Sequence, residues 1–142
     1  KMKMVQETNY DKMEKLGIIQ AVHDLADSEN DSYARFQAEG YMDLIVEVIG
    51  KKNDKVLVSM AHYYQQNGDS VPDPEMEILV DFKYRMAHAI SFSNAFGMVR
   101  SEFQEGDGGV LIDPRAKKEN DAFLGKWLSN LKQQGFKLKA VE

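Results

Sequence analysis

The chain has 142 residues, of which 43% are hydrophobic and 29% charged, and its formal net charge is −5. This length favours one folded domain over residues 1–142, because two separate cores would each be marginal, and the composition is far from that of a disordered chain. Because the chain contains no cysteine, thiol catalysis, cysteine-ligated metals and disulfides are excluded. No apolar run is long enough to cross a membrane, and the first residues lack the apolar core of a signal peptide, so we expect a cytoplasmic protein.

Charge is spread unevenly along the chain. Residues 114–142 contain seven lysines and arginines against three acidic residues, which leaves a net charge of −9 on residues 1–113. An acidic body repels a phosphate backbone, although a basic terminal helix can still touch one. The sequence therefore disfavours direct binding of DNA or RNA.

The first predicted element is a helix over residues 10–27. Thr8-Asn-Tyr-Asp11 resembles a helix-start box, and polar turn formers at residues 27–32 end the helix. Between them, apolar residues recur at steps of three and four, as expected of one helix face: Met13, Leu16, Ile19, Val22 and Ala26.

Alternating patterns then predict strands. Residues 33–37 are strand-like, and in residues 41–48 and 56–64 apolar side chains recur at every second position, as in strands with one buried face. Because residues 50–54 are turn formers, the latter two runs predict a β-hairpin. Residues 76–82 predict a further strand of the same kind.

The second half predicts two more strands and a closing helix. Residues 87–93 and 97–103 are short apolar runs typical of another hairpin, and the glycine-rich segment 106–109 is expected to be a loop. Asp113-Pro114 is a typical helix start, and the helix should end before Gly135. Its apolar stripe consists of Phe123, Leu124, Trp127, Leu128 and Leu131.

These elements predict an α+β fold, in which an antiparallel sheet of five or six strands carries an N-terminal helix and a C-terminal helix packed on it. Trp127 is expected to anchor the closing helix to the sheet. Because two helices cover only one face, the other face should be open, with Tyr41, Ile45, Leu57 and Tyr63 on it.

Two blocks of sequence resemble a known family. The first is His-Tyr-Tyr-x-Gln-Asn-Gly-Asp-x-x-x-Asp-Pro-Glu-Met at residues 62–76, and the second is the closing helix at residues 120–136. Together they resemble an uncharacterised family of small bacterial proteins from phages and conjugative elements, over about residues 33–136. The resemblance implies a protein of a mobile element, where accessory and host-defence-interfering roles are common, and it implies no activity.

The first of these blocks also collects groups that hard divalent cations prefer. Asp69, Asp73 and Glu75 are candidate oxygen ligands near His62. A second interpretation is a solvated acidic strand face, because alternation places Glu75 and Glu77 opposite the apolar residues of their strand. Both interpretations stay open at this point.

His62 has two structural interpretations of its own. It shares a strand face with apolar residues, where a histidine is usually a hydrogen-bonded core residue. Alternatively, it pins residues 65–75, which are expected to form a loop, by bonding a backbone carbonyl, Asp69 or Asp73, while Asn67-Gly68 forms the turn.

The favoured functional hypothesis is a non-enzymatic binding protein that needs no cofactor and engages a basic surface of a host protein or a second copy of itself. One alternative is a metal-dependent hydrolase built on His62, Asp69, Asp73 and Glu75. Another is a protein that sequesters a small ligand between the sheet and the C-terminal helix. The candidate binding residues are Tyr41, His62, Tyr63, Asn67, Asp69, Asp73 and Glu75.

Overall fold

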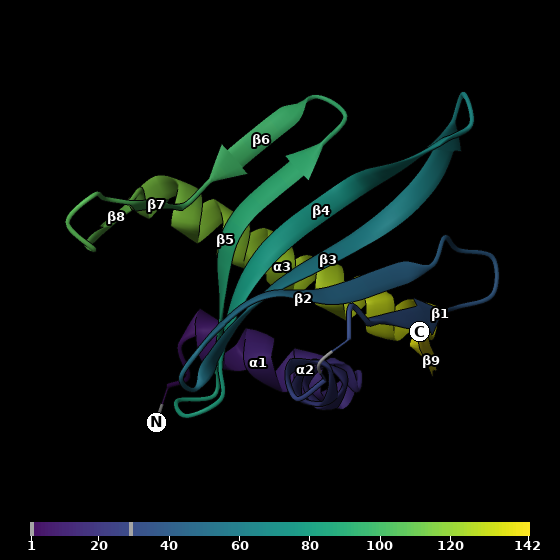
Figure 1. Ribbon diagram of the computed structural model, residues 1–142, viewed down its shortest axis with the longest axis horizontal. Coiled ribbons are helices and arrows are strands. Elements are labelled where there is room, and N and C mark those ends of the chain that lie inside the picture. The colour runs from purple at the N-terminus through teal and green to yellow at the C-terminus, as the bar shows by residue number, and fades with distance from the viewer. Residues whose placement is uncertain (1, 29) are drawn as a thin grey trace.

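The computed structural model of the chain describes residues 2–28 and 30–142. Over these residues the chain forms three helices and nine strands (Figure 1). In chain order they are α1 (Val5–Lys15), α2 (Ile18–Ala26), β1 (Tyr33–Gln37), β2 (Leu44–Lys52), β3 (Lys55–Gln66), β4 (Asp69–Asp81), β5 (Met86–Asn94), β6 (Gly97–Arg100), β7 (Glu102–Gln104), β8 (Val110–Ile112), α3 (Pro114–Gln134) and β9 (Lys137–Val141).

Seven of these strands form one antiparallel sheet in the order β6-β5-β4-β3-β2-β1-β9, and β7 pairs with β8 in a separate ribbon. The α+β prediction is confirmed, with more strands than the predicted five or six. Figure 1 shows the sheet in front, α3 behind it, and α1 and α2 below it. None of the helices formed by the described residues packs on the front face, which we call the open face.

The core lies between the sheet and the helices. Alternate residues of the central strands, such as Val58, Met60 and Ile78, are fully buried there, and α3 adds Leu124 and Leu128. Each such side chain contributes about 1.5–3 kcal/mol through removal of apolar surface from water. The period-two pattern of the strands and the stripe of α3 therefore decide which sheet face is covered.

The helix predicted over residues 10–27 is wrong in one respect, because it is two helices. Gly17 has a φ of 85°, a left-handed conformation that favours glycine, and it separates α1 from α2. The first helix also begins earlier, at Val5, where the backbone N–H of Met4 donates to Glu7 Oε1 at 3.0 Å. Asp11, predicted at the helix start, lies inside α1.

The first three strands follow the prediction closely. The strand predicted over residues 33–37 is β1, and the predicted hairpin is β2 paired with β3. Its turn is shorter than expected, because β2 continues to Lys52 and β3 starts at Lys55. The additional strand β9 pairs with β1 at the edge of the sheet and was not predicted.

Residues 65–75, expected to be a loop, are mostly strand. β3 continues to Gln66 and β4 begins at Asp69, so the turn consists of Asn67 and Gly68. Both turn residues have positive φ, 53° and 86°, the pattern of a type I′ hairpin turn.

The β3–β4 hairpin extends beyond its neighbours in the sheet. Pairing with β2 ends at the Leu44–His62 pair, and pairing with β5 ends at the Glu75–Ser93 pair. Residues 63–72 therefore pair only with one another in the described chain, and we call them the arm. In Figure 1 the arm curves away from β2.

The second half matches the prediction in outline. β5 and β6 form the expected hairpin, but β6 ends at Arg100, and the loop at residues 106–109 joins β7 to β8. Asp113 caps α3, since its Oδ1 accepts from the backbone N–H of Ala116 at 3.1 Å, and Gly135 ends it with a φ of 87°. Of the helices in the described residues, none has the length and apolar character needed to cross a membrane.

Candidate functional site

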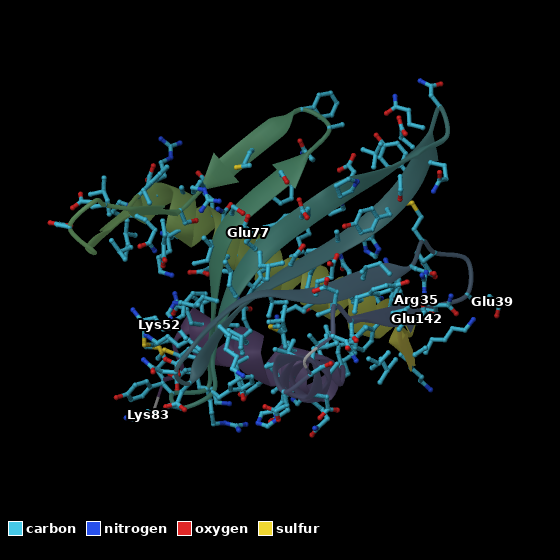
Figure 2. All side chains as sticks on the ribbon, viewed as in Figure 1. Arg35, Glu39, Lys52, Glu77, Lys83 and Glu142 are labelled. Carbon is cyan, nitrogen blue, oxygen red and sulfur yellow. The ribbon has the colours of Figure 1, made fainter. Side chains whose placement is uncertain are left out.

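A row of mostly polar side chains crosses the open face from β1 to β6. Much of it is satisfied within the protein: Arg100 Nη2 lies 3.4 Å from Glu77 Oε1, and Ser59 Oγ donates to Glu75 Oε2 at 3.0 Å. The acids predicted as a solvated strand face are thus largely engaged, and Figure 2 shows Glu77 at the centre of the sheet. The strand register aligns Tyr33, Glu47, Ser59, Glu77, Ser91 and Arg100 in this row.

A hollow lies at the other end of this face, between the arm and strands β1 and β2. It has a volume of about 530 Å³, and we call it the concave site. Because the arm departs from β2, side chains of four strands converge on a space that no strand fills. Its lining residues are Tyr33, Arg35, Met42, Asp43, Ile45, Glu47, Tyr63, Gln65 and Ser70.

Arg35 is already neutralised by carboxylates within this site. Its Nη1 donates to Asp43 Oδ2 at 2.5 Å and its Nε donates to Glu142 Oε1 at 3.3 Å; Figure 2 shows Arg35 beside Glu142. The Tyr33 hydroxyl donates to Glu142 Oε2 at 2.7 Å, and together with Arg35 it lowers the pKa of Glu142. Lys139 also lowers the pKa of both carboxyls electrostatically. The positive charges of Arg35 and Lys139 therefore balance the negative side chains of Asp43 and Glu142.

Asp43 stays ionised despite its partial burial. Burial works to raise the pKa of Asp43, but hydrogen bonds from Gln37 and Arg35 outweigh it and hold that pKa below its usual value. The Asp43 carboxylate accepts from Gln37 Nε2 at 3.1 Å as well as from Arg35. This fixed network forms the rigid wall of the concave site.

Glu47 is a negatively charged residue of the concave site that takes no part in this network. Its half-buried side chain lies directly across from Tyr33 in the register, and its carboxylate makes no hydrogen bond or ion pair among the described residues. Burial raises the pKa of Tyr63, and the negative charges of Glu47 and Glu75 raise it further, so the Glu47 carboxylate acts electrostatically on Tyr63. A partly desolvated carboxylate without a partner is costly, and it attracts a cation.

His62 lies on the helix side and bridges the sheet to α3. Its Nε2 accepts from the indole N–H of Trp127 at 3.2 Å, so its Nδ1 carries the proton and donates to the carbonyl oxygen of Asp43 at 3.1 Å. Burial lowers the pKa of His62. The interpretation as a hydrogen-bonded core residue thus holds, whereas bonds to Asp69 or Asp73 do not form.

The aromatic residues expected on the open face divide between the two sides. Tyr63 and Ile45 line the concave site. Tyr41 lies instead beside Phe136, with 6.1 Å between ring centroids, and Phe136 also contacts His62 on the helix side. Leu57 is half-buried. The expectation of Tyr41 on the open face is therefore wrong.

The acidic residues proposed as metal ligands are spread along the hairpin. Asp69 pairs with Gln66 beside the Asn67 turn, whereas Glu75 is six residues further along β4, about 20 Å away at the usual strand rise. Asp73 makes no hydrogen bond or ion pair with the described residues. Among residues 2–28 and 30–142, no group of three or more histidine and acidic side chains is arranged to hold a metal ion.

The small-ligand alternative needed space between the sheet and the C-terminal helix. Trp127 and Leu128 of α3 and Met60 and Met76 of the sheet are all buried there, in contact with the core cluster. This interface is packed, and the hollow lies on the opposite side of the sheet.

Of the nine residues that line the concave site, Tyr63 and Ile45 were expected on the open face and the other seven were not predicted. Three of these seven carry the proposed chemistry of the site: Tyr33, Arg35 and Glu47. A signal for them exists in the sequence, because Tyr33 and Arg35 alternate with buried Ala34 and Phe36 in β1. Their alignment with Glu47 depends on the pairing of β1 with β2, which a single sequence does not show.

Comparison with known proteins identifies one family. A family described as a domain of unknown function (DUF6908) matches residues 13–137, which is most of the chain. Neither the curated proteins nor the solved structures contain a match to the chain.

Proposed function

This chain belongs to the DUF6908 family, and we propose that it is a non-enzymatic binding protein that holds a cationic segment of a partner protein in the concave site. The observation that carries the proposal is the unpaired, half-buried carboxylate of Glu47 between Tyr33 and Tyr63. The site offers a charge and two rings to a ligand, while hydrogen bonds hold Arg35 and Asp43 in place.

The charge balance of the site favours a cation over an anion. An anionic ligand would have to displace Asp43 or Glu142 from Arg35, which they already neutralise. A lysine ammonium or arginine guanidinium would instead pair with Glu47 and lie near the faces of Tyr33 and Tyr63. A cation over an aromatic ring contributes about 0.5–2 kcal/mol.

The arm favours an extended segment of polypeptide as the ligand. Beyond the Leu44–His62 pair, the edge of β3 that faces the concave site has no strand partner in the described chain. Such an edge presents backbone donors and acceptors, to which an extended peptide adds as a further strand. Side chains at every second position of that peptide would then face the open side of the sheet.

The setting of this binding protein is part of the same proposal. The resemblance of residues 62–76 and 120–136 to proteins of phages and conjugative elements supports an accessory or defence-interfering role encoded on a mobile element. The lack of cysteine supports a reducing compartment, the cytoplasm, as the place where the protein meets its partner.

A peptide selection tests the proposal directly. Short random peptides are selected on the wild-type protein, and dissociation constants of the best binders are measured by fluorescence anisotropy. We expect the selected peptides to share a lysine or arginine, and Glu47→Gln to weaken them about tenfold or more, since a hydrogen bond to a charged group contributes about 1.5–3 kcal/mol.

A matched control removes the same charge elsewhere. Glu119 lies on α3, where it pairs with Arg115 at 3.3 Å, and Glu119→Gln should leave peptide binding unchanged. Selected peptides without a shared cationic residue, or equal losses in the two variants, would show that the concave site is not the binding site.

A further inference from the structure

A second hollow lies between α1 and α3, which pack side by side in the helix layer. It has a volume of about 520 Å³, and we call it the lysine groove. It lies away from the concave site and shares no residue with it. Its lining residues are Lys12, Lys15, Leu128, Ser129, Lys132 and Gln133.

None of the three lysines of this groove forms an ion pair with a carboxylate among the described residues. The side chains of Lys15 and Lys132 make no hydrogen bond or ion pair among the described residues. Lys12 is half-buried, and its Nζ donates to the carbonyl oxygen of Gly125 at 3.1 Å. An ammonium group has three donors, so Lys12 keeps two of them for another acceptor.

The nearest acidic residues of α1 are engaged by other cations. Asp11 pairs with Lys3 and lies 3.9 Å from Arg85 Nη2, and Glu14 Oε1 accepts from the same Nη2 at 2.8 Å. These carboxylates therefore form their ion pairs with cations outside the groove, although Lys15 also lowers the pKa of Asp11 electrostatically. The groove remains a concentrated positive site on a chain whose net charge is −5.

Helix electrostatics explains only part of this arrangement. A lysine in the last turn of a helix offsets the partial negative charge of the free carbonyl groups, which accounts for Lys12 and Lys15 of α1 and Lys132 of α3 taken one helix at a time. It does not account for three like charges lining one hollow, where they repel one another. A shared anion would remove that repulsion.

We propose that the lysine groove binds a small phosphorylated molecule. The phosphate oxygens would accept charge-assisted hydrogen bonds from Lys12, Lys15 and Lys132. Ser129 and Gln133 add neutral donors at the rim, and Leu128 gives an apolar floor for the rest of the molecule. The volume lies within the range of known small-molecule sites.

The test uses inorganic pyrophosphate as the probe and backbone amide NMR of the intact chain as the readout. We expect saturable shifts centred on residues 12–15 and 128–133, with a dissociation constant of about a millimolar or lower at ~0.15 M salt. Lys15→Gln and Lys132→Gln should each weaken binding about fivefold or more. Both replaced side chains are exposed, so the variants should fold normally.

A charge-matched control separates a site from general attraction. Lys118 lies on the same helix, 14 residues before Lys132 and about 21 Å from it along the axis, and Lys118→Gln should leave pyrophosphate binding unchanged. An equal loss in Lys118→Gln, or shifts spread over all lysines and abolished by salt, would overturn the proposal.

Two further probes identify the source of the phosphate. Tighter binding of a single-stranded oligonucleotide than of pyrophosphate, with Lys118 contributing, would make this face a nucleic-acid surface and overturn the proposal. Co-sedimentation with phosphatidic acid vesicles that depends on Lys15 and Lys132, without saturable binding of pyrophosphate, would overturn it in favour of a lipid headgroup. Saturable pyrophosphate binding alone supports a free phosphorylated molecule.

Discussion

Replacing Gly125 with alanine is expected to destabilise the protein, although alanine is the better helix former. Gly125 is buried in the middle of α3, where the helix packs on α1. A Cβ atom at this position would lie 2.8 Å from Asn9 Oδ1, closer than atoms of these types approach. Asn9 is itself buried, and its Nδ2 donates to the carbonyl oxygen of Asp121 at 3.0 Å.

The expected magnitude follows from three opposing contributions. Glycine to alanine in a helix interior gains about 1 kcal/mol. Displacing Asn9 breaks its bond to Asp121, and a buried amide left unsatisfied costs about 1–3 kcal/mol. Overpacking a buried contact costs a further 1–3 kcal/mol or so. The net expectation is a loss of about 3 kcal/mol, or about 9 °C in Tm for a chain of this size.

Urea denaturation of four proteins tests this reasoning: the wild type, Gly125→Ala, Asn9→Ala and the double variant. Without Asn9 the obstructing oxygen is gone, so Gly125→Ala should stabilise the Asn9→Ala protein by about 1 kcal/mol. The sign of the substitution should thus reverse between the two backgrounds. A stabilising effect in the wild type, or the same loss in both backgrounds, would refute the contact as its cause.

Two further predictions concern the helix layer. Burial lowers the pKa of His62 in the folded protein below its usual value of 6.5. As the pH falls, the unfolded chain therefore binds a proton at this histidine before the folded protein does. The stability that neutral His62 provides is complete above about pH 6.5 and is lost as the pH falls toward the lower folded-state pKa. Thermal melts from pH 7.5 to 5 should therefore show a smaller loss for His62→Phe than for the wild type, and parallel curves would contradict this. Asp113→Ala should lower the free energy of unfolding by about 1 kcal/mol, because the carboxylate caps the backbone N–H groups of Arg115 and Ala116, and Asp113→Ser should recover most of it in urea titrations. Equal losses for alanine and serine would exclude a capping role.

The elements that the sequence predicts well are those whose burial has a simple period. β1, the β2–β3 hairpin and α3 each bury one face, so apolar residues recur at steps of two or of three and four. The break at Gly17 was missed because the apolar stripe continues across it from Met13 to Ile19. β9 was missed because its side chains are mostly exposed, and it is a strand through its pairing with β1.

The arm shows where turn chemistry misleads. Residues 69–75 contain two prolines and three acidic residues, a composition typical of loops. They form a strand because Asn67-Gly68 closes a tight hairpin and pairs them with β3. Proline has no backbone N–H to donate, and it is tolerated there because pairing of β4 with β5 begins only at Glu75, so residues 69–74 need no donor on that side.

The candidate site was predicted only in part for a related reason. Tyr63 could be placed on the open face from alternation alone. The roles of Arg35, Glu47 and Glu142 depend on contacts between segments far apart in the chain, which local patterns do not encode. Glu47 becomes distinctive only when its neighbours are known to have other partners.

Asp43 forms hydrogen bonds on both sides of the sheet, through its carboxylate and through its carbonyl oxygen. Its carboxylate holds Arg35 at the concave site, while its carbonyl oxygen holds His62, which in turn accepts from the indole of Trp127. Because His62 is hydrogen-bonded to both residues, a displacement of Asp43 is expected to shift His62 and so to change the surroundings of Trp127, the chain's single tryptophan. Intrinsic fluorescence of Trp127 therefore distinguishes two kinds of ligand in the concave site: one that shifts Asp43 should change the emission, and one that only pairs with Glu47 should leave it unchanged.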